Sequence, residues 1–143
     1  MADLIELINQ TPHAAELGIT LSKYDEKEIT LSIPYKPELI GDPDSGILHG
    51  GVVTSLVDTA SGSAAFLAIK QKEMIATLDL RIDYLKPAAP NATLFATAWC
   101  YRITQQVLFV RCQVFQETQE NCIAESMSTF IRNGFLPESH SWE

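Results

Sequence analysis

Residues 46–62 read GILHGGVVTSLVDTASG and open the long apolar stretch that decides the fold. Two glycines follow His49, and the only charged residue between His49 and Lys70 is Asp58. The stretch predicts a helix over roughly residues 50–70. A lone membrane span would tolerate the acid poorly, and several Ser and Thr residues accompany it. We therefore expect the core helix of a soluble domain.

The two sides of this helix differ in composition at about 100° per residue. The large apolar side, expected to face a sheet, contains Val53, Leu56, Val57, Ala60, Ala64 and Leu67. The nearly opposite side contains Thr54, Asp58, Ser61 and Ala65. Small residues are unusual on a solvated helix face, so this side indicates close approach of a second subunit or a ligand. Asp58 could equally accept a hydrogen bond from a neighbouring hydroxyl group.

The residues before the helix allow two interpretations. Gly50 and Gly51 would leave backbone N–H groups open at the positive end of the helix dipole, which suits an anion or a developing oxyanion. Alternatively, the glycines permit a tight turn and close packing, and His49 is a packed, hydrogen-bonded histidine. The residues alone leave both possibilities open.

The rest of the chain predicts mostly strands. Residues 1–16 predict an amphipathic helix with an apolar stripe of Leu4, Ile5, Leu7 and Ile8. A hairpin over residues 17–35 and a loop over residues 36–48 should follow. Four further strands are expected in residues 75–87, 93–103, 106–118 and 122–134. Six antiparallel strands and one long helix predict an α+β domain in which a curved sheet wraps around the helix.

Strict alternation in the first of these four strands predicts its two faces. One face should carry Ala76, Leu78, Leu80, Ile82 and Tyr84. The other should carry Thr77, Asp79, Arg81 and Asp83. Because one helix cannot cover the whole sheet and its edges, we expect a dimer.

Composition narrows the class of protein. The 143 residues suit a single domain over 1–143, with the helix in 1–16 and a poorly ordered tail over 134–143. A formal net charge of −8 argues against a nucleic-acid partner. Three cysteines with no two-residue spacing argue against a disulfide framework or a structural zinc site, and favour reduced thiols in the cytoplasm. The amino terminus has neither the basic start nor the apolar run of a signal peptide.

Two segments, LHGGVVTSLVDTASG and TLDLRIDYLKPA, together resemble the PaaI-like acyl-CoA thioesterases of the hotdog-fold superfamily. The resemblance extends over roughly residues 10–133 in element order and length. It implies a hotdog fold, a homodimer that usually pairs again into a tetramer, and active sites at the dimer interface. The implied reaction is hydrolysis of an acyl-CoA thioester, without a metal or redox cofactor, coenzyme A being part of the substrate.

The resemblance also assigns roles to four residues. Gly50 matches a glycine whose N–H binds the thioester carbonyl oxygen. Asp58 matches a carboxylate, supplied by the other subunit, that acts as nucleophile or general base. Thr77 matches a position that helps to hold the attacking water, and His49 should position the loop or the substrate.

Four further residues are expected to bind substrate: Gly51, Asp42, Ser61 and Leu78. Asp42 departs from the resemblance, because many members of the family have an asparagine nearby. An ionised aspartate cannot donate the hydrogen bond that an amide would donate. A second acid could also raise the pKa of a neighbouring acid if the two lie close together.

Two alternative functions remain open. A hotdog hydratase or dehydratase of enoyl or 3-hydroxyacyl thioesters uses a histidine with a carboxylate, which His49 and Asp58 could imitate. A non-catalytic acyl-CoA-binding module is the other alternative. The acyl group, aromatic or medium-chain, is not readable, since Phe66, Leu67, Met74 and Trp99 could line an acyl pocket or belong to the core.

Overall fold

The structure, a computed structural model, describes residues 2–69 and 73–132. Its helices are α1 (Ala2–Gln10), α2 (Pro12–Leu17), the short 3₁₀ helix η1 (Pro37–Leu39) and α3 (Gly50–Ala68). Its strands are β1 (Thr20–Tyr24), β2 (Glu28–Ile33), β3 (Ile40–Asp42), β4 (Ile47–Leu48), β5 (Ile75–Tyr84), β6 (Leu94–Ile103), β7 (Val107–Gln116) and β8 (Thr118–Arg132).

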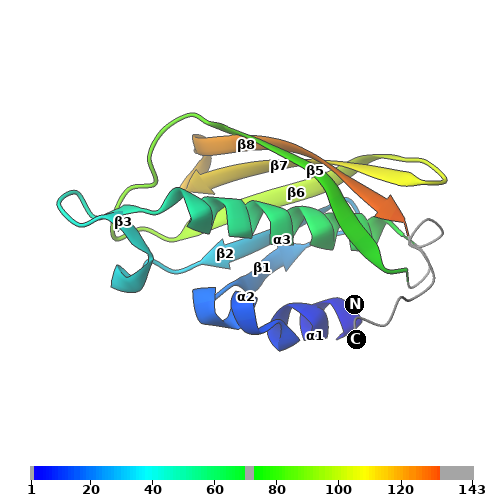
Figure 1. Cartoon of the computed structure of the whole chain (residues 1–143), viewed down its shortest axis with the longest axis horizontal. Coiled ribbons are helices and arrows are strands. Elements are labelled where there is room, and N and C mark those ends of the chain that lie inside the picture. The colour runs from blue at the N-terminus through cyan, green and yellow to red at the C-terminus, as the bar shows by residue number, and fades with distance from the viewer. Residues whose placement is uncertain (1, 70–72, 133–143) are drawn as a thin grey trace, which may run out of the picture.

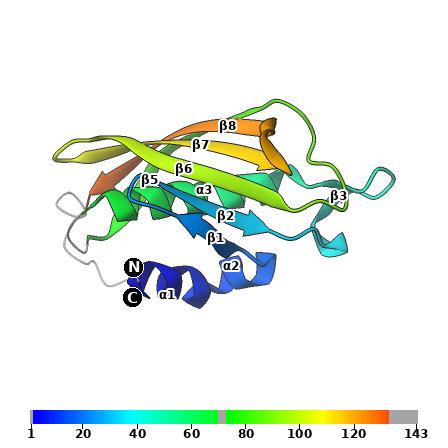
Figure 2. The same cartoon turned by 180° about the vertical axis from the view of Figure 1, so that it is seen from behind.

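Six strands form one antiparallel sheet in the order β1-β2-β6-β7-β8-β5. The sheet curves around α3, and α1 and α2 lie beside β1 (Figure 1; Figure 2 shows the other side). The predicted α+β architecture is confirmed. In the described residues, β1 and β5 are the two edges of this sheet.

The core lies between α3 and the concave face of the sheet. Leu56, Val57 and Ala60 of α3 are completely buried, as are Leu31 of β2 and Val110 of β7. The burial of these apolar side chains is the main favourable contribution to folding. The helix also has the length and apolar content of a membrane span, but half of that stretch is buried inside the domain.

The small-residue side of α3 is less open than predicted. Ser61 and Ala65 are completely buried, while Thr54 and Asp58 are half-buried. The prediction of two opposite faces is therefore wrong at Ser61 and Ala65, because a curved sheet encloses more of a helix than a flat one would.

The amino-terminal prediction needs one correction. The helix breaks at Thr11, and Pro12 begins α2, where its missing N–H costs nothing because a first-turn N–H has no partner within the helix. Of the predicted apolar stripe, Leu4 and Ile8 are buried and Ile5 is 37% exposed. The side chain of Leu7 lies outside the described residues, and so does the expected tail over 134–143. The predicted loop over 36–48 contains η1 and a small β3–β4 hairpin at the start of α3.

A β-bulge in β5 overturns the predicted alternation. Thr77 pairs with Phe130 of β8, but Asp79 pairs with the next residue, Thr129, so Leu78 is the extra residue. The extra residue shifts the alternation by one position. Thr77 consequently lies on the α3 side of the sheet, together with Leu80, and not with the exposed acids of β5.

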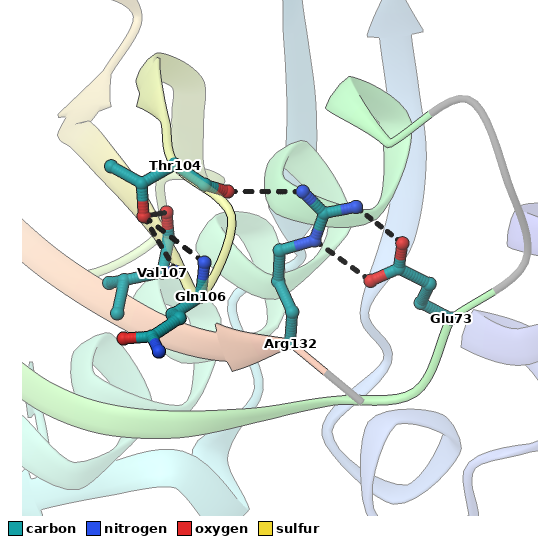
Figure 3. A network of polar contacts seen from close by, with 5 residues as sticks. All are labelled: Glu73, Thr104, Gln106, Val107 and Arg132. Carbon is teal, nitrogen blue, oxygen red and sulfur yellow. Dashed lines mark hydrogen bonds and ion pairs between the residues drawn. The ribbon is translucent and has the colours of Figure 1, made fainter. Parts of the chain in front are cut away.

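A partly buried ion pair fixes the start of β5 (Figure 3). The guanidinium group of Arg132 binds both carboxylate oxygens of Glu73, with its Nε 2.9 Å from Oε2. Its Nη1 also donates to the carbonyl oxygen of Thr104 in the β6–β7 turn, at 3.0 Å. The hydrogen bonds from Arg132 lower the pKa of Glu73. The network joins the end of β8 to the segment that enters β5.

Candidate active site

The amino terminus of α3 presents one open backbone donor. His49 is the N-cap residue: its Nδ1 accepts a hydrogen bond from the N–H of Gly51 at 2.9 Å, and its carbonyl oxygen accepts one from Val52 at 2.9 Å. The N–H of Gly50 makes no hydrogen bond to any described residue. It is therefore an unpaired donor, among the described residues, at the positive end of a 19-residue helix.

The two glycines have different reasons to lack a side chain. A Cβ on Gly51 would lie 2.9 Å from Nδ1 of His49, so alanine there would disturb the cap. A Cβ on Gly50 would meet only Tyr84, whose hydroxyl oxygen would lie 3.8 Å away and whose nearest ring carbon would lie 4.0 Å away. Gly51 therefore fits the histidine cap. Its N–H was expected to bind substrate, but it already donates to Nδ1 of His49.

Tyr84 holds the peptide group of Gly50 in place. Its hydroxyl donates to the carbonyl oxygen of Gly50 at 3.0 Å and lies 2.8 Å from Oγ1 of Thr54. Oγ1 of Thr54 also donates to that carbonyl oxygen, at 3.2 Å. Sequence reasoning did not single out Tyr84. Its only signal was its place in the TLDLRIDYLKPA segment.

Asp58 and Thr77 form a second polar pair further along α3. Oγ1 of Thr77 donates to Oδ1 of Asp58 at 2.9 Å, which leaves the other carboxylate oxygen of Asp58 without a hydrogen-bond partner among the described residues. The two residues lie at a cavity of about 280 Å³ between α1, α3 and β5. The bulge at Leu78 makes this contact possible, because it turns Thr77 toward the helix.

Gly50 and Asp58 lie far apart within one chain. They are separated by eight positions in α3, which corresponds to about 12 Å along the helix axis at 1.5 Å per residue. A single thioester group cannot touch both. One chain thus presents two half-sites, one at each position.

The other residues that were expected to bind substrate do not lie beside Asp58 and Thr77 at the cavity. Asp42 is exposed and accepts hydrogen bonds from Ser45 and Asp44 in its own turn, and the Ser45 hydroxyl is the main cause of its lowered pKa. No contact between Asp42 and Asp58 occurs among the described residues. Ser61 is buried away from the cavity, and Leu78 is 54% exposed on the bulge.

In the part of the chain that the structure describes, the cysteines and acids form no second catalytic or metal centre. Cys100, Cys112 and Cys122 are free thiols, and burial raises the pKa of Cys112 to about 12, so that thiol stays protonated. Within residues 2–69 and 73–132, no three His, Cys, Asp or Glu side chains come together as metal ligands.

Comparisons with known proteins identify the family of this chain. The family model described as the thioesterase superfamily matches residues 45–123. The chain is 29% identical over 133 residues to the medium/long-chain acyl-CoA thioesterase YigI of Salmonella typhimurium, covering 84% of both proteins.

Solved structures show the same arrangement of elements. A protein from Pseudomonas aeruginosa is 37% identical, with a TM-score of 0.83 over 92% of this chain and 97% of that one. A thioesterase from Haemophilus influenzae is 25% identical, with a TM-score of 0.82 over 97% and 93%. The PaaI protein of E. coli, 22% identical with a TM-score of 0.78 over 89% and 88%, shares the fold.

Proposed function

The chain belongs to the thioesterase superfamily, and from that premise we propose that it hydrolyses acyl-CoA thioesters to the free acid and coenzyme A. The observation that most directly supports this proposal is the hydrogen-bonded pair of Thr77 and Asp58 at the edge of an apolar cavity. The name of the relative YigI supports coenzyme A as the leaving group. No metal or redox cofactor is needed for this reaction.

Gly50 supplies the electrophilic half of the proposed mechanism. Its open N–H polarises the thioester carbonyl and stabilises the negative charge that develops on the oxygen. His49 and Tyr84 keep this donor in position, His49 by capping the next N–H and Tyr84 by binding the Gly50 carbonyl oxygen. Neither residue needs to transfer a proton.

Asp58 supplies the nucleophilic half. As general base, its free oxygen takes a proton from water while the water oxygen attacks the carbonyl carbon; the C–S bond then breaks and the thiolate of coenzyme A takes up the proton. As nucleophile, the carboxylate attacks the carbonyl carbon, the C–S bond breaks and the thiolate of coenzyme A leaves; water then hydrolyses the resulting mixed anhydride. A single turnover in H₂¹⁸O identifies the second route when water attacks the Asp58 carbonyl carbon of the anhydride, because the label then enters Asp58.

The half-sites imply a homodimer. Since Gly50 and Asp58 of one chain lie about 12 Å apart, a second copy brings its Asp58 to the thioester held by Gly50. The edge strand β5 supports this pairing, because its outer edge is unpaired in the described chain and carries exposed Leu78 and Tyr84 (54% and 52%). We propose that dimers pair again into tetramers, as the resemblance implies, and that the free thiols reflect a cytoplasmic location.

Steady-state release of CoA from a panel of aromatic and medium-chain acyl-CoAs tests the proposal. Turnover of at least one thioester supports it. Tight binding without CoA release would identify a binding module instead. Addition of water to an enoyl-CoA, without release of CoA, would identify a hydratase.

A further inference from the structure

The cavity beside Asp58 is lined by apolar groups from distant parts of the chain. Ile8 of α1, Phe66 of α3 and Ile75 of β5 contribute side chains, and Phe130 of β8 closes one side. Asp58 is the only charged side chain among the described residues that line it. An apolar space with one acid at its edge suits an uncharged group attached to a reacting centre.

The hydroxyl groups in the lining do not make the cavity polar. Thr59 donates to the carbonyl oxygen of Ser55 at 2.7 Å, and Ser63 donates to that of Thr59 at 2.7 Å. Both hydroxyls are thus engaged with the backbone of α3, as is common for such residues within a helix. The cavity consequently offers a ligand few hydrogen bonds beyond those at Asp58, Thr77 and Thr11.

Gly62 leaves space in this cavity at a cost to the helix. Glycine inside a helix is less favourable than alanine, because it loses more backbone entropy on folding. Close packing does not require it, because a Cβ at Gly62 would have Phe130 as its nearest neighbour, at an ordinary 3.6 Å. What the missing side chain provides is room beside Asp58.

The volume of the cavity indicates the size of its occupant. An apolar cavity of about 150 Å³ accommodates benzene, and this one has about 280 Å³. If a methylene group takes roughly the 30 Å³ of a water molecule in the liquid, the space holds about nine carbons of a chain. α1 contacts α3 and runs alongside it (Figure 1), and Ile8 of α1 forms part of the cavity wall.

We propose that this cavity binds a straight aliphatic acyl chain, and that Gly62 and Phe66 set its length. The inference rests on the proposed function and makes it specific. The acyl chain lies in the subunit that supplies Asp58, while the thioester carbonyl rests on Gly50 of the other subunit. The two chains therefore meet at the reacting carbonyl group of the substrate.

The test is kcat/KM for saturated acyl-CoAs of four to sixteen carbons, together with phenylacetyl-CoA. For the wild type, kcat/KM should rise about fourfold per methylene, because burying one is worth about 0.8 kcal/mol and 1.36 kcal/mol is tenfold. The rise should end near octanoyl- or decanoyl-CoA. A preference for phenylacetyl-CoA over octanoyl-CoA would overturn the aliphatic assignment.

Two variants test the cavity itself. Gly62→Val fills it and should move the optimum two or three carbons shorter; valine is at least as favourable as glycine in a helix, so the variant should fold. Phe66→Ala enlarges the cavity and should move the optimum to longer chains. The matched control is Phe95→Ala, which makes the same truncation where Phe95 stacks on Phe115, on the face of the sheet away from α3.

The outcomes separate this inference from the proposed function. An unchanged chain-length profile in both Gly62→Val and Phe66→Ala, with active enzyme, would overturn the cavity assignment and leave the thioesterase intact. A shifted profile in Phe95→Ala would also contradict it, because the shift would then reflect general loosening. Absence of CoA release from every thioester by the wild type would overturn both proposals.

Discussion

Replacing Thr77 by valine removes one hydrogen bond and keeps the shape of the side chain. The bond runs from Oγ1 of Thr77 to Oδ1 of Asp58 at 2.9 Å, and Asp58 is half-buried. Valine has no donor, so the carboxylate loses its partner on β5 and gains rotational freedom. If Asp58 must be held in one orientation to act on the thioester, the chemical step should slow.

The size of the effect follows from the kind of bond. A hydrogen bond to a charged group contributes about 1.5–3 kcal/mol. Because Asp58 is half-buried, water can replace part of the lost bond, and we expect the lower part of this range, about 1.5–2 kcal/mol. At 1.36 kcal/mol per tenfold, kcat should fall about ten- to thirtyfold. KM should change little, since valine keeps the size and shape of the Thr77 side chain at the wall of the cavity.

The assay is CoA release followed with a thiol-reactive chromogen, with octanoyl-CoA as substrate. A blank without substrate is needed, because Cys100 and Cys122 are free and only partly buried. Thr77→Ser is the matched control: it keeps the hydroxyl group and should retain kcat within about threefold of the wild type, a change of about 0.7 kcal/mol. A kcat for Thr77→Val within twofold of the wild type would refute the role of this bond.

Three further outcomes are expected. Asp58→Asn should abolish CoA release while the oligomer, measured by size-exclusion chromatography, stays intact; near wild-type turnover would exclude Asp58 as base or nucleophile. Tyr84→Phe should lower kcat about two- to tenfold by freeing the Gly50 peptide, since a neutral hydrogen bond is worth about 0.5–1.5 kcal/mol; a lower Tm with unchanged kcat would limit Tyr84 to a structural role. The pKa of Glu73 is lowered because Arg132 favours the charged form of its carboxylate. The stabilisation by Glu73 is therefore fully present when the pH is above the usual pKa of 4.5. It is lost as the pH falls through the lowered pKa. The Tm difference between wild type and Glu73→Gln should therefore be present at pH 7 and vanish in strong acid, and a constant difference would contradict the ion pair.

Much of the fold was predictable because its signals are local. The apolar run after His49 predicted α3, and alternation predicted the β1–β2 hairpin. The break at Pro12 was missed, although proline at a first helical turn is a recognisable signal. The β3–β4 hairpin was missed because two-residue and three-residue strands are too short to show a period.

The sequence by itself determined α3, the six strands of the main sheet, the family resemblance and the choice of Gly50 and Asp58, because periodicity and motif spacing are properties of neighbouring residues. The side of the sheet on which Thr77 lies was decided only in three dimensions, by the bulge at Leu78. The tertiary structure also decided the contact of Tyr84 with Gly50, 34 positions away in the chain. It likewise formed the cavity between α1, α3 and β5. Each depends on where the curved sheet brings distant segments together, and no local pattern records that.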